Sequence, residues 1–595
     1  MDDRIATFDA WHPGLDSEIP PRLQPRATLY RPENSTVGYA EAREAAEYCG
    51  LKPRDMVATR LERLVTHELL VRVTADLTVP DGPNYEDLGI SLRGIVARIE
   101  EVHVAPEMEG LRRRFEAFRK EADARIRAIL EADVFAPAPP APPEAPPARR
   151  GLLGTLFGAR AAAPPPAPAR RQPPEFAALE AWRETAPRTK DDLDRACLES
   201  LATVVGGIVG RHGRLLADRD MVARFALNMV LNGQGSRQVG EWIEPIIRKA
   251  AAREGYRFLP VQAKSIFLNV KGSSAAGKST IRPAQRALAG KLGVPWENFA
   301  LISPDYWRKH LLDYQSLGED YKYAAMLTGQ ELEIIDRKLD RHMEAKALGQ
   351  ALPHVLIDRF RFDSFDTSRD SSKTSQLLTR FSDTVFLFFV ITPPADTVER
   401  SWKRGLQTGR FKAVDDLLYH NIEAYSGMPN LFFPTVLSAS KTMHFEFLDN
   451  SVALGERPRT IAFGRNGQMT ILDLARLNDI DRFRNVNVAA TRPEEVLPED
   501  PEDSFAFLAA CLRRIPEVIL ADHATAAVYG ATRNGNWIYR APADAPCAAV
   551  GGFEARCLAA LGWDGPLDAA DPPRLDVEAE RRLTLGAWGA RAAPQ

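Results

Sequence analysis

The chain has 595 residues, of which 45% are hydrophobic and 26% are charged, and its formal net charge is only -3. This length suits roughly four domains, and the composition excludes a fibrous repeat and a wholly disordered chain. The near-neutral charge excludes a general attraction to nucleic acid or to an anionic membrane, so any site for a polyanion must be local.

Residues 1–135 are predicted to form an α-rich N-terminal domain. Hydrophobic periodicity predicts helices, and one Val- and Leu-rich run predicts a strand. The expected helices span 37–48, 53–64, 87–102 and 108–133, and the expected strand spans 68–77. The Asp81-Gly82-Pro83 segment is interpreted as a turn, because the acidic residues around it lack the spacing of a calcium-binding loop.

Residues 136–174 are predicted to be a linker. They carry 13 of the 44 prolines of the chain, mostly in Ala-Pro strings that favour an extended backbone over a packed core. After the linker, residues 175–260 are predicted to form a helical scaffold. Its clearest helical stretches are 178–182, 193–205, 221–231 and 239–252.

The segment 261–445 is predicted to be an α/β core, and it begins with a phosphate-binding motif. A buried-strand run at 265–270 leads directly into the pattern G-x-x-x-x-G-K-S. Its glycines let backbone N–H groups point at phosphate oxygens, Lys278 reaches the β and γ phosphates, and Ser279 offers a hydroxyl to Mg²⁺. A helix is expected from Ser279 onward, with its positive end toward the phosphates. The nucleotide-binding residues are therefore Gly272, Ser273, Ser274, Ala275, Ala276, Gly277, Lys278, Ser279 and Thr280.

The next expected strand, 299–303, ends just before Asp305 and Arg308. The carboxyl ends of parallel strands are where ligands bind in doubly wound folds. Asp305 there can accept a proton from an attacking hydroxyl, and Arg308 can hold an anionic group of the acceptor. The alternative is that Asp305 only caps the following helix.

A third expected strand, 354–358, follows a long amphipathic helix at 328–348. This strand ends in Asp358, which stands where a Walker-B carboxylate would organise the Mg²⁺ shell. The alternative is an aspartate that only caps a turn.

A fourth expected strand, 384–391, leads into a helix that starts at the Thr392-Pro-Pro394 segment. Arg400 and Arg404 share one face of this helix before Gly405, and Arg410 follows Gly409. We predict that these three arginines form a lid over the nucleotide, with Arg404 neutralising charge on the transferring phosphoryl group. The alternative is a solvated basic helix.

Residues 446–595 are predicted to form a C-terminal α+β region. The pairs Asn466-Gly467 and Asn534-Gly535 each stand between two apolar runs, which is typical of β-hairpins. The expected fold is therefore multidomain, with a P-loop NTPase parallel sheet that has helices on both faces, and with an α-rich domain before it.

Five widely spaced cysteines without a C-x-x-C pair argue against a zinc module and against a disulfide scaffold. The N-terminus is acidic and lacks an apolar signal region, and no apolar run approaches the ~20 residues of a membrane helix. We therefore expect a cytoplasmic protein without a transmembrane segment.

The motifs of the core, from about 265 to 427, resemble those of the zeta-toxin-like family of P-loop kinases. The resemblance rests on the 272–280 loop, on Asp305-Tyr-Trp-Arg308, on Leu356-Ile-Asp358 with Arg361, and on the arginines between 400 and 410. It implies a phosphotransferase that uses ATP or GTP with Mg²⁺, with Asp305 as general base and Lys278 at the phosphates. It further implies that Arg308 and Arg361 contact the acceptor, a small molecule with a hydroxyl group such as a nucleotide sugar.

Two other functions remain open at this level. The Asp305-x-x-Arg308 arrangement is similar to that of 5′-hydroxyl polynucleotide kinases, so nucleic acid is an alternative acceptor. The core could also bind the nucleotide without transferring phosphate, as a switch whose flanking regions recruit a protein partner.

Overall fold

The computed structural model describes residues 8–84, 86–135, 172–359, 382–438, 440–453, 455–498, 504–542, 552–565, 567 and 571–589. The chain divides into two compact units. The sheet unit comprises Met1–Thr28, Thr66–Pro106 and Ile243–Gln595, and the helical unit comprises Leu29–Val65 and Glu107–Trp242. Most of the expected linker, 136–171, lies outside the described residues. The domain boundaries expected from the sequence, after residues 135, 174, 260 and 445, stay a prediction.

Two helices of the helical unit begin directly after an aspartate that caps them. Asp191 accepts a hydrogen bond from the Asp194 amide at 2.9 Å, and Asp218 accepts one from the Met221 amide at 2.8 Å, so each aspartate caps the helix that follows it. The helix expected at 53–64 is wrong over most of its length, because a 3₁₀ turn, Pro53–Asp55, forms at its start and only the residues from Leu61 onward are α-helical. The α-helices are α1 Tyr39–Cys49, α4 Met108–Leu130, α5 Pro174–Thr185, α6 Asp192–His212 and α7 Arg219–Val230, with α8 Ser236–Glu254 starting in this unit.

The strand expected at 68–77 is also wrong, because these residues belong to the helix α2, Leu61–Asp76. Leu69, Leu70 and Val73 are all fully buried. From Leu64 to Ala75 this helix is buried on every side, polar residues included, so it shows no amphipathic period and its Val- and Leu-rich run looks like a buried strand in the sequence. The next expected helix is confirmed as α3, Asp87–Arg98, continued by a π-helical turn, Ile99–Val104.

A ten-stranded sheet forms the centre of the sheet unit. Its strand order is β10-β9-β8-β7-β6-β5-β4-β1-β3-β2. The five strands from β5 to β2 in this order are parallel to one another, and β7 is parallel to β8, whereas all other neighbouring pairs are antiparallel. The strands are β1 Ile266–Lys271, β2 Phe299–Ile302, β3 His354–Asp358, β4 Thr384–Ile391, β5 Thr442–Asp449, β6 Arg459–Arg465, β7 Gln468–Ile471, β8 Glu517–Ala521, β9 Val528–Arg533 and β10 Asn536–Arg540.

The four strands expected in the core and the two expected hairpins are confirmed, and the α/β class with them. The second hairpin, β9–β10, turns at Asn534 and Gly535, whose φ angles are 48° and 80°. Positive φ at both positions is what a two-residue turn between twisted strands requires. The strand β5 was not expected, and it joins the core to the C-terminal strands in one continuous sheet.

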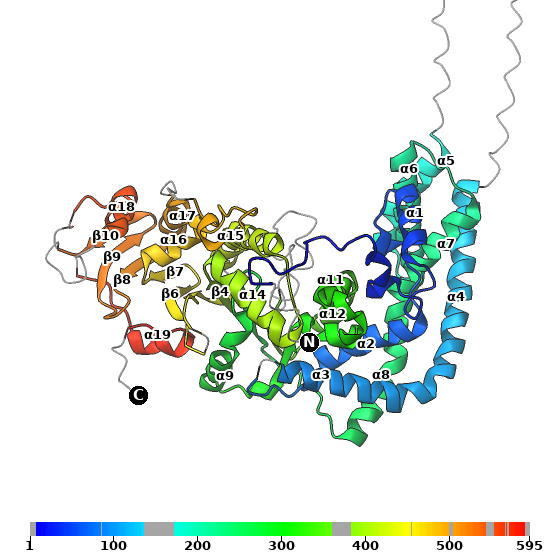
Figure 1. The fold of residues 1–595 in the computed structure, drawn as a ribbon, viewed down its shortest axis with the longest axis horizontal. Helices are drawn as coiled ribbons and strands as arrows, with labels where there is room; N and C mark the ends of the chain where they lie inside the picture. The colour runs from blue at the N-terminus through cyan, green and yellow to red at the C-terminus, as the bar shows by residue number, and fades with distance from the viewer. Residues whose placement is uncertain are drawn as a thin grey trace, which may run out of the picture. The chain divides into compact units, whose positions relative to one another are not determined.

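The two faces of the sheet pack against different helices. Leu387 and Phe389 of β4 belong to a core shared with α15 Val414–Val436, α16 Leu474–Arg482, α17 Ala506–Arg514 and α18 Phe553–Ala560, which lie along one side of the strands in Figure 1. The alternate residues Phe386 and Phe388 point to the opposite face, where α19, Val577–Leu583, lies. Among the described residues there is no helix whose length and hydropathy would let it cross a bilayer.

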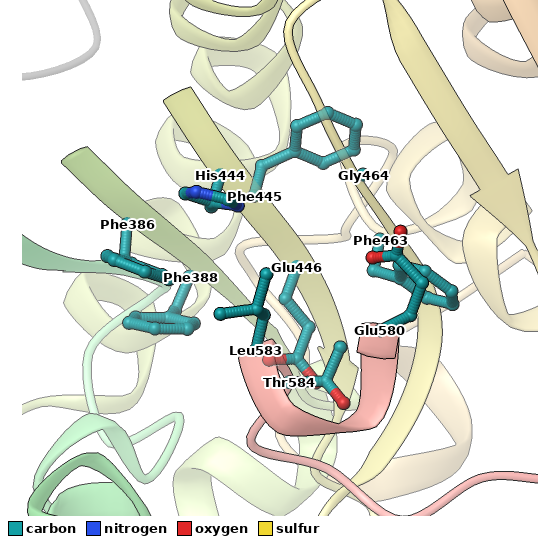
Figure 2. A pocket seen from close by; sticks show the side chains of 10 residues that line it. All are labelled: Phe386, Phe388, His444, Phe445, Glu446, Phe463, Gly464, Glu580, Leu583 and Thr584. Atoms are coloured by element: carbon teal, nitrogen blue, oxygen red, sulfur yellow. The ribbon is translucent and has the colours of Figure 1, made fainter. Parts of the chain in front are cut away.

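A small pocket lies between α19 and the strands β4, β5 and β6 (Figure 2), and it has room for about one water molecule. On its floor the Glu446 carboxylate accepts hydrogen bonds from Thr460 Oγ1 at 2.7 Å, the Leu585 amide at 2.7 Å and the Gly586 amide at 2.9 Å. Burial raises the pKa of Glu446, whereas these donors favour its charged form. The Glu446 carboxylate therefore holds the C-terminal segment at Leu585 and Gly586. The pocket itself is too small for a nucleotide.

We expect Glu446→Ala to loosen that segment. The substitution leaves two buried amides and one buried hydroxyl without their acceptor, which costs about 3 kcal/mol in total. Hydrogen exchange at the Leu585 and Gly586 amides should become about a hundredfold faster. Glu578→Ala, at an exposed position of α19, is the matched control. Unchanged exchange at both amides would show that Glu446 does not hold the segment.

Candidate active site

The phosphate-binding motif forms a tight loop between β1 and the next helix. Ala275 and Gly277 have φ angles of 59° and 89°, a left-handed conformation that turns the backbone sharply. A Cβ on Gly272 would lie 2.9 Å from the Val390 carbonyl oxygen, so only glycine lets β4 come so close. The Ala276 carbonyl accepts hydrogen bonds from Thr392 Oγ1 at 2.9 Å and from Asn450 Nδ2 at 2.8 Å. The residues that follow β4 and β5 therefore hold the loop in place.

The helix after the loop begins later than expected. Lys278–Ile281 form a 3₁₀ turn, and the α-helix α9 spans Arg282–Lys291. Pro283 explains the difference, because it has no N–H to donate to the Ser279 carbonyl, as an α-helix from Ser279 would need. A proline in the first turn of α9 is favourable.

Lys278 and Ser279 point in two directions from this turn. The Lys278 ammonium donates to the carbonyl oxygens of Gly272 at 3.1 Å and Ser273 at 2.8 Å, so it lies within the curl of the loop. Burial lowers the pKa of Lys278 to about 8, although the charges of Asp358 and Asp305 oppose this shift. The Ser279 hydroxyl donates to Asp358 Oδ2 at 2.6 Å. The two residues expected to bind Mg²⁺ are therefore in direct contact.

This pair has the right chemistry for Mg²⁺. The ion prefers oxygen ligands and keeps several waters, and in nucleotide sites it is bound through one or two protein groups together with the phosphates. The Ser279 hydroxyl and the Asp358 carboxylate lie in contact, so both could bind one Mg²⁺ ion. The described residues hold no group of three or more His, Cys, Asp or Glu side chains suited to a metal, so the phosphates and water would have to complete the shell.

Asp305 follows β2 within a 3₁₀ turn, Pro304–Trp307, and is paired with two arginines. Its carboxylate lies 2.9 Å from Arg308 Nε and 2.6 Å from Arg410 Nη2. Burial alone would raise the pKa of the carboxyl, but the two positive charges outweigh it and hold the pKa of Asp305 well below its usual range. As long as both arginines stay in place, Asp305 is a weak base.

Arg308 is held by the protein on its other side as well. Its Nη1 donates to the Ala325 carbonyl at 2.6 Å and to Thr328 Oγ1 at 2.8 Å. These partners lie in α11, Ala324–Leu327, and at the start of α12, Gly329–Leu348. Arg308 therefore orients Asp305 in this structure, and its expected contact with an acceptor stays a prediction.

The helix α14, Pro394–Thr408, passes through Gly405 and is capped by Gly409. A Cβ on Gly405 would lie 2.5 Å from the Phe411 ring, so the glycine makes room for that ring against the helix. Gly409, with a φ of 77°, reverses the chain. Phe411 is buried against α14, and its neighbour Arg410 pairs with Asp305.

Three further polar residues join this site, and sequence reasoning missed them. Lys412 Nζ lies 2.7 Å from Asp416 Oδ2 and 2.6 Å from His420 Nδ1. Burial and the Lys412 charge lower the pKa of His420 to about 3, so the imidazole is neutral. No motif in the sequence marks these three residues, and only the fold brings them to the site.

The expected lid arginines lie in different surroundings. Arg400 Nη2 donates to the carbonyls of Asn450 at 2.7 Å and Val452 at 3.0 Å, which fastens it beside Gly277. Arg404 donates to Ser401 Oγ at 3.2 Å, and its charge acts on Lys278, Asp305 and Lys412. Arg361 lies outside the described residues. Whether α14 moves as a lid stays a prediction.

All of these groups gather at one edge of the sheet. The loop follows β1, Asp305 follows β2, Asp358 ends β3, Thr392 follows β4 and Asn450 follows β5. These five strands are parallel, so their carboxyl ends lie together. No protein-family model matches the chain, and no curated protein matches it.

Proposed function

We propose that this chain is a phosphotransferase of the zeta-toxin-like kind, which moves the γ-phosphate of ATP or GTP to a hydroxyl group of a small anionic acceptor. The observation that carries the proposal is the contact of Ser279 with Asp358, together with Asp305 and its two arginines, since both carboxylates are close enough to act on the loop lysine Lys278. The loop lysine, Ser279 and Asp358 suit a nucleotide with Mg²⁺. Asp305 and its arginines suit an acceptor hydroxyl.

The topology of the sheet supports the position of the nucleotide. The chain leaves β1 to form β2 and β3 on one side of it and then crosses to β4 on the other side. Ligands of open α/β sheets bind beyond the carboxyl ends of the strands at such a reversal. The phosphate loop follows β1, the strand at which this reversal takes place.

The concentration of positive charge supports a substrate with several phosphates. Lys278, Arg308, Arg404, Arg410 and Lys412 are close enough for their charges to act on one another or on Asp305. Like charges this close repel one another, and phosphate oxygens that pair with them relieve that repulsion. Mg²⁺, when bound, would neutralise further charge on the β and γ phosphates.

In the proposed reaction the acceptor oxygen forms a bond to the γ-phosphorus, and the bond from this phosphorus to the bridging β-oxygen breaks. The acceptor proton passes to Asp305, and the nucleoside diphosphate leaves. Asp305 becomes basic enough only when it loses one ion pair. We infer that Arg410 moves from Asp305 to the γ-phosphate, so that phosphate binding itself frees the base.

Radiolabelled γ-phosphate transfer tests the proposal. The protein is incubated with labelled ATP or GTP and Mg²⁺, either with a cell metabolite extract or with RNA and DNA oligonucleotides that carry 5′-hydroxyl groups. Label in a small anionic molecule is the expected result. Label in oligonucleotides overturns the acceptor class, and nucleotide binding without any transfer overturns the enzyme in favour of a nucleotide switch.

A further inference from the structure

A residue far from the core in sequence contacts the helix that follows the phosphate loop. Asp81 lies in the segment Thr66–Pro106 of the sheet unit, and its side chain is only 2% exposed. Its Oδ2 lies 2.9 Å from Arg286 Nη2, which also donates to the Asp81 carbonyl oxygen at 2.8 Å. Its Oδ1 lies 3.4 Å from Arg282 Nη1. Asp81 therefore binds two arginines of α9 that are one helical turn apart.

Arg282 connects Asp81 to the expected Mg²⁺ ligands. Its Nη2 lies 3.5 Å from Asp358 Oδ2, the same oxygen that accepts the Ser279 hydrogen bond. The Arg282 and Asp358 side chains are 7% and 6% exposed, so water screens their attraction poorly. Tyr306 OH, 3.4 Å from Arg282 Nη1, is the other polar neighbour on this side. A single buried arginine thus stands between two buried carboxylates.

We propose that Asp81 is a positioning residue for metal binding, because it draws Arg282 away from Asp358 and leaves that carboxylate available to the nucleotide's Mg²⁺. This inference rests on the proposed function. The arginine is shared at 3.4 and 3.5 Å, longer than a close ion pair, so each carboxylate weakens the hold of the other. Without the Asp81 charge, Arg282 closes on Asp358 and competes with the metal for it.

The test is the Mg²⁺ dependence of nucleotide binding by the full chain, measured with a fluorescent ATP analogue while Mg²⁺ is titrated. Asp81→Asn keeps the size of the side chain and removes its charge. We expect the apparent Mg²⁺ affinity to fall about tenfold, as is typical when a partner of a metal ligand is lost. Binding of the analogue without Mg²⁺ should stay within about twofold of wild type, because the loop and Lys278 are untouched.

Two further variants separate positioning from simple folding. Asp81→Asn combined with Arg282→Gln removes the competitor, so the Mg²⁺ affinity should return to within about threefold of wild type. Arg286→Gln removes the other arginine partner of Asp81, which does not reach Asp358, and should leave the affinity within about twofold.

Unchanged Mg²⁺ dependence in Asp81→Asn overturns the inference. So does a loss that the double substitution fails to restore. A wild-type chain that binds no nucleotide contradicts instead the proposed function, so the two failures are distinguishable.

Discussion

Replacing Lys278 by methionine should reduce phosphoryl transfer at least about a hundredfold while the sheet unit stays folded. The substitution removes the ammonium that would stabilise charge on the β and γ phosphates, a loss of about 3 kcal/mol or more. It keeps most of the length and the apolar part of the side chain. In the free protein it removes the hydrogen bonds to the carbonyl oxygens of Gly272 and Ser273 in the loop.

The measurement is single-turnover transfer of labelled γ-phosphate, with circular dichroism and nucleotide affinity on the same preparation. Lys264→Met is the matched control, because Lys264 is an exposed lysine just before β1, the strand that leads into the loop. It should leave transfer unchanged. Full turnover by Lys278→Met would contradict the assignment of the loop as the phosphate site.

Asp305→Asn should separate an enzyme from a nucleotide switch. Asparagine keeps the shape of the side chain but cannot take a proton, and loss of a general base typically costs about 10² to 10⁴ in rate. Affinity for Mg-ATP should change by less than about threefold, because loop amides, Lys278 and Ser279 hold the phosphates. Asp305 is paired with Arg410 and Arg308. Phosphate binding that draws Arg410 away would therefore make Asp305 a stronger base.

Transfer and affinity are measured together, and Asp313→Asn is the control. Asp313 lies eight positions further along the chain and is exposed, and its carboxylate accepts a local hydrogen bond from the Gln315 amide at 3.0 Å. Its substitution should change neither quantity. Unchanged transfer in Asp305→Asn would remove Asp305 from the mechanism.

The N-terminal part of the chain has a larger role in the sheet unit than its sequence indicates. The helix α3 lies against the turn that carries Asp305, since Arg93 Nη1 donates to the Tyr306 carbonyl at 3.1 Å. Lys309 and His310, just after Arg308, pair with Glu86 at 3.1 Å and Glu100 at 3.2 Å. The segment that contains Asp81 therefore contacts the turn that carries Asp305 as well as the helix α9 that follows the loop.

The sequence by itself determined the parts of this protein that depend on neighbouring residues. The motif from Gly272 to Thr280, the buried strands of the core and the Asn-Gly hairpins are local patterns, and each reflects a local requirement of backbone conformation or burial. Ser279 and Asp358 lie in contact because the loop that carries Ser279 follows β1 and Asp358 ends the parallel strand β3, so both lie at one edge of the sheet; their expected role in Mg²⁺ binding stays a prediction.

Only the tertiary structure decided the contacts between distant segments. The sequence predicted Asp81 as part of a turn and 68–77 as a strand, and it carried no sign that Asp81 would meet α9 or that α2 would be buried on all sides. Asn450 and Lys412 likewise have no motif, and they join the site because β5 and the turn at Gly409 bring them there. Local propensity and periodicity describe single elements, whereas ion pairs between elements depend on how those elements pack, which no short stretch of sequence encodes.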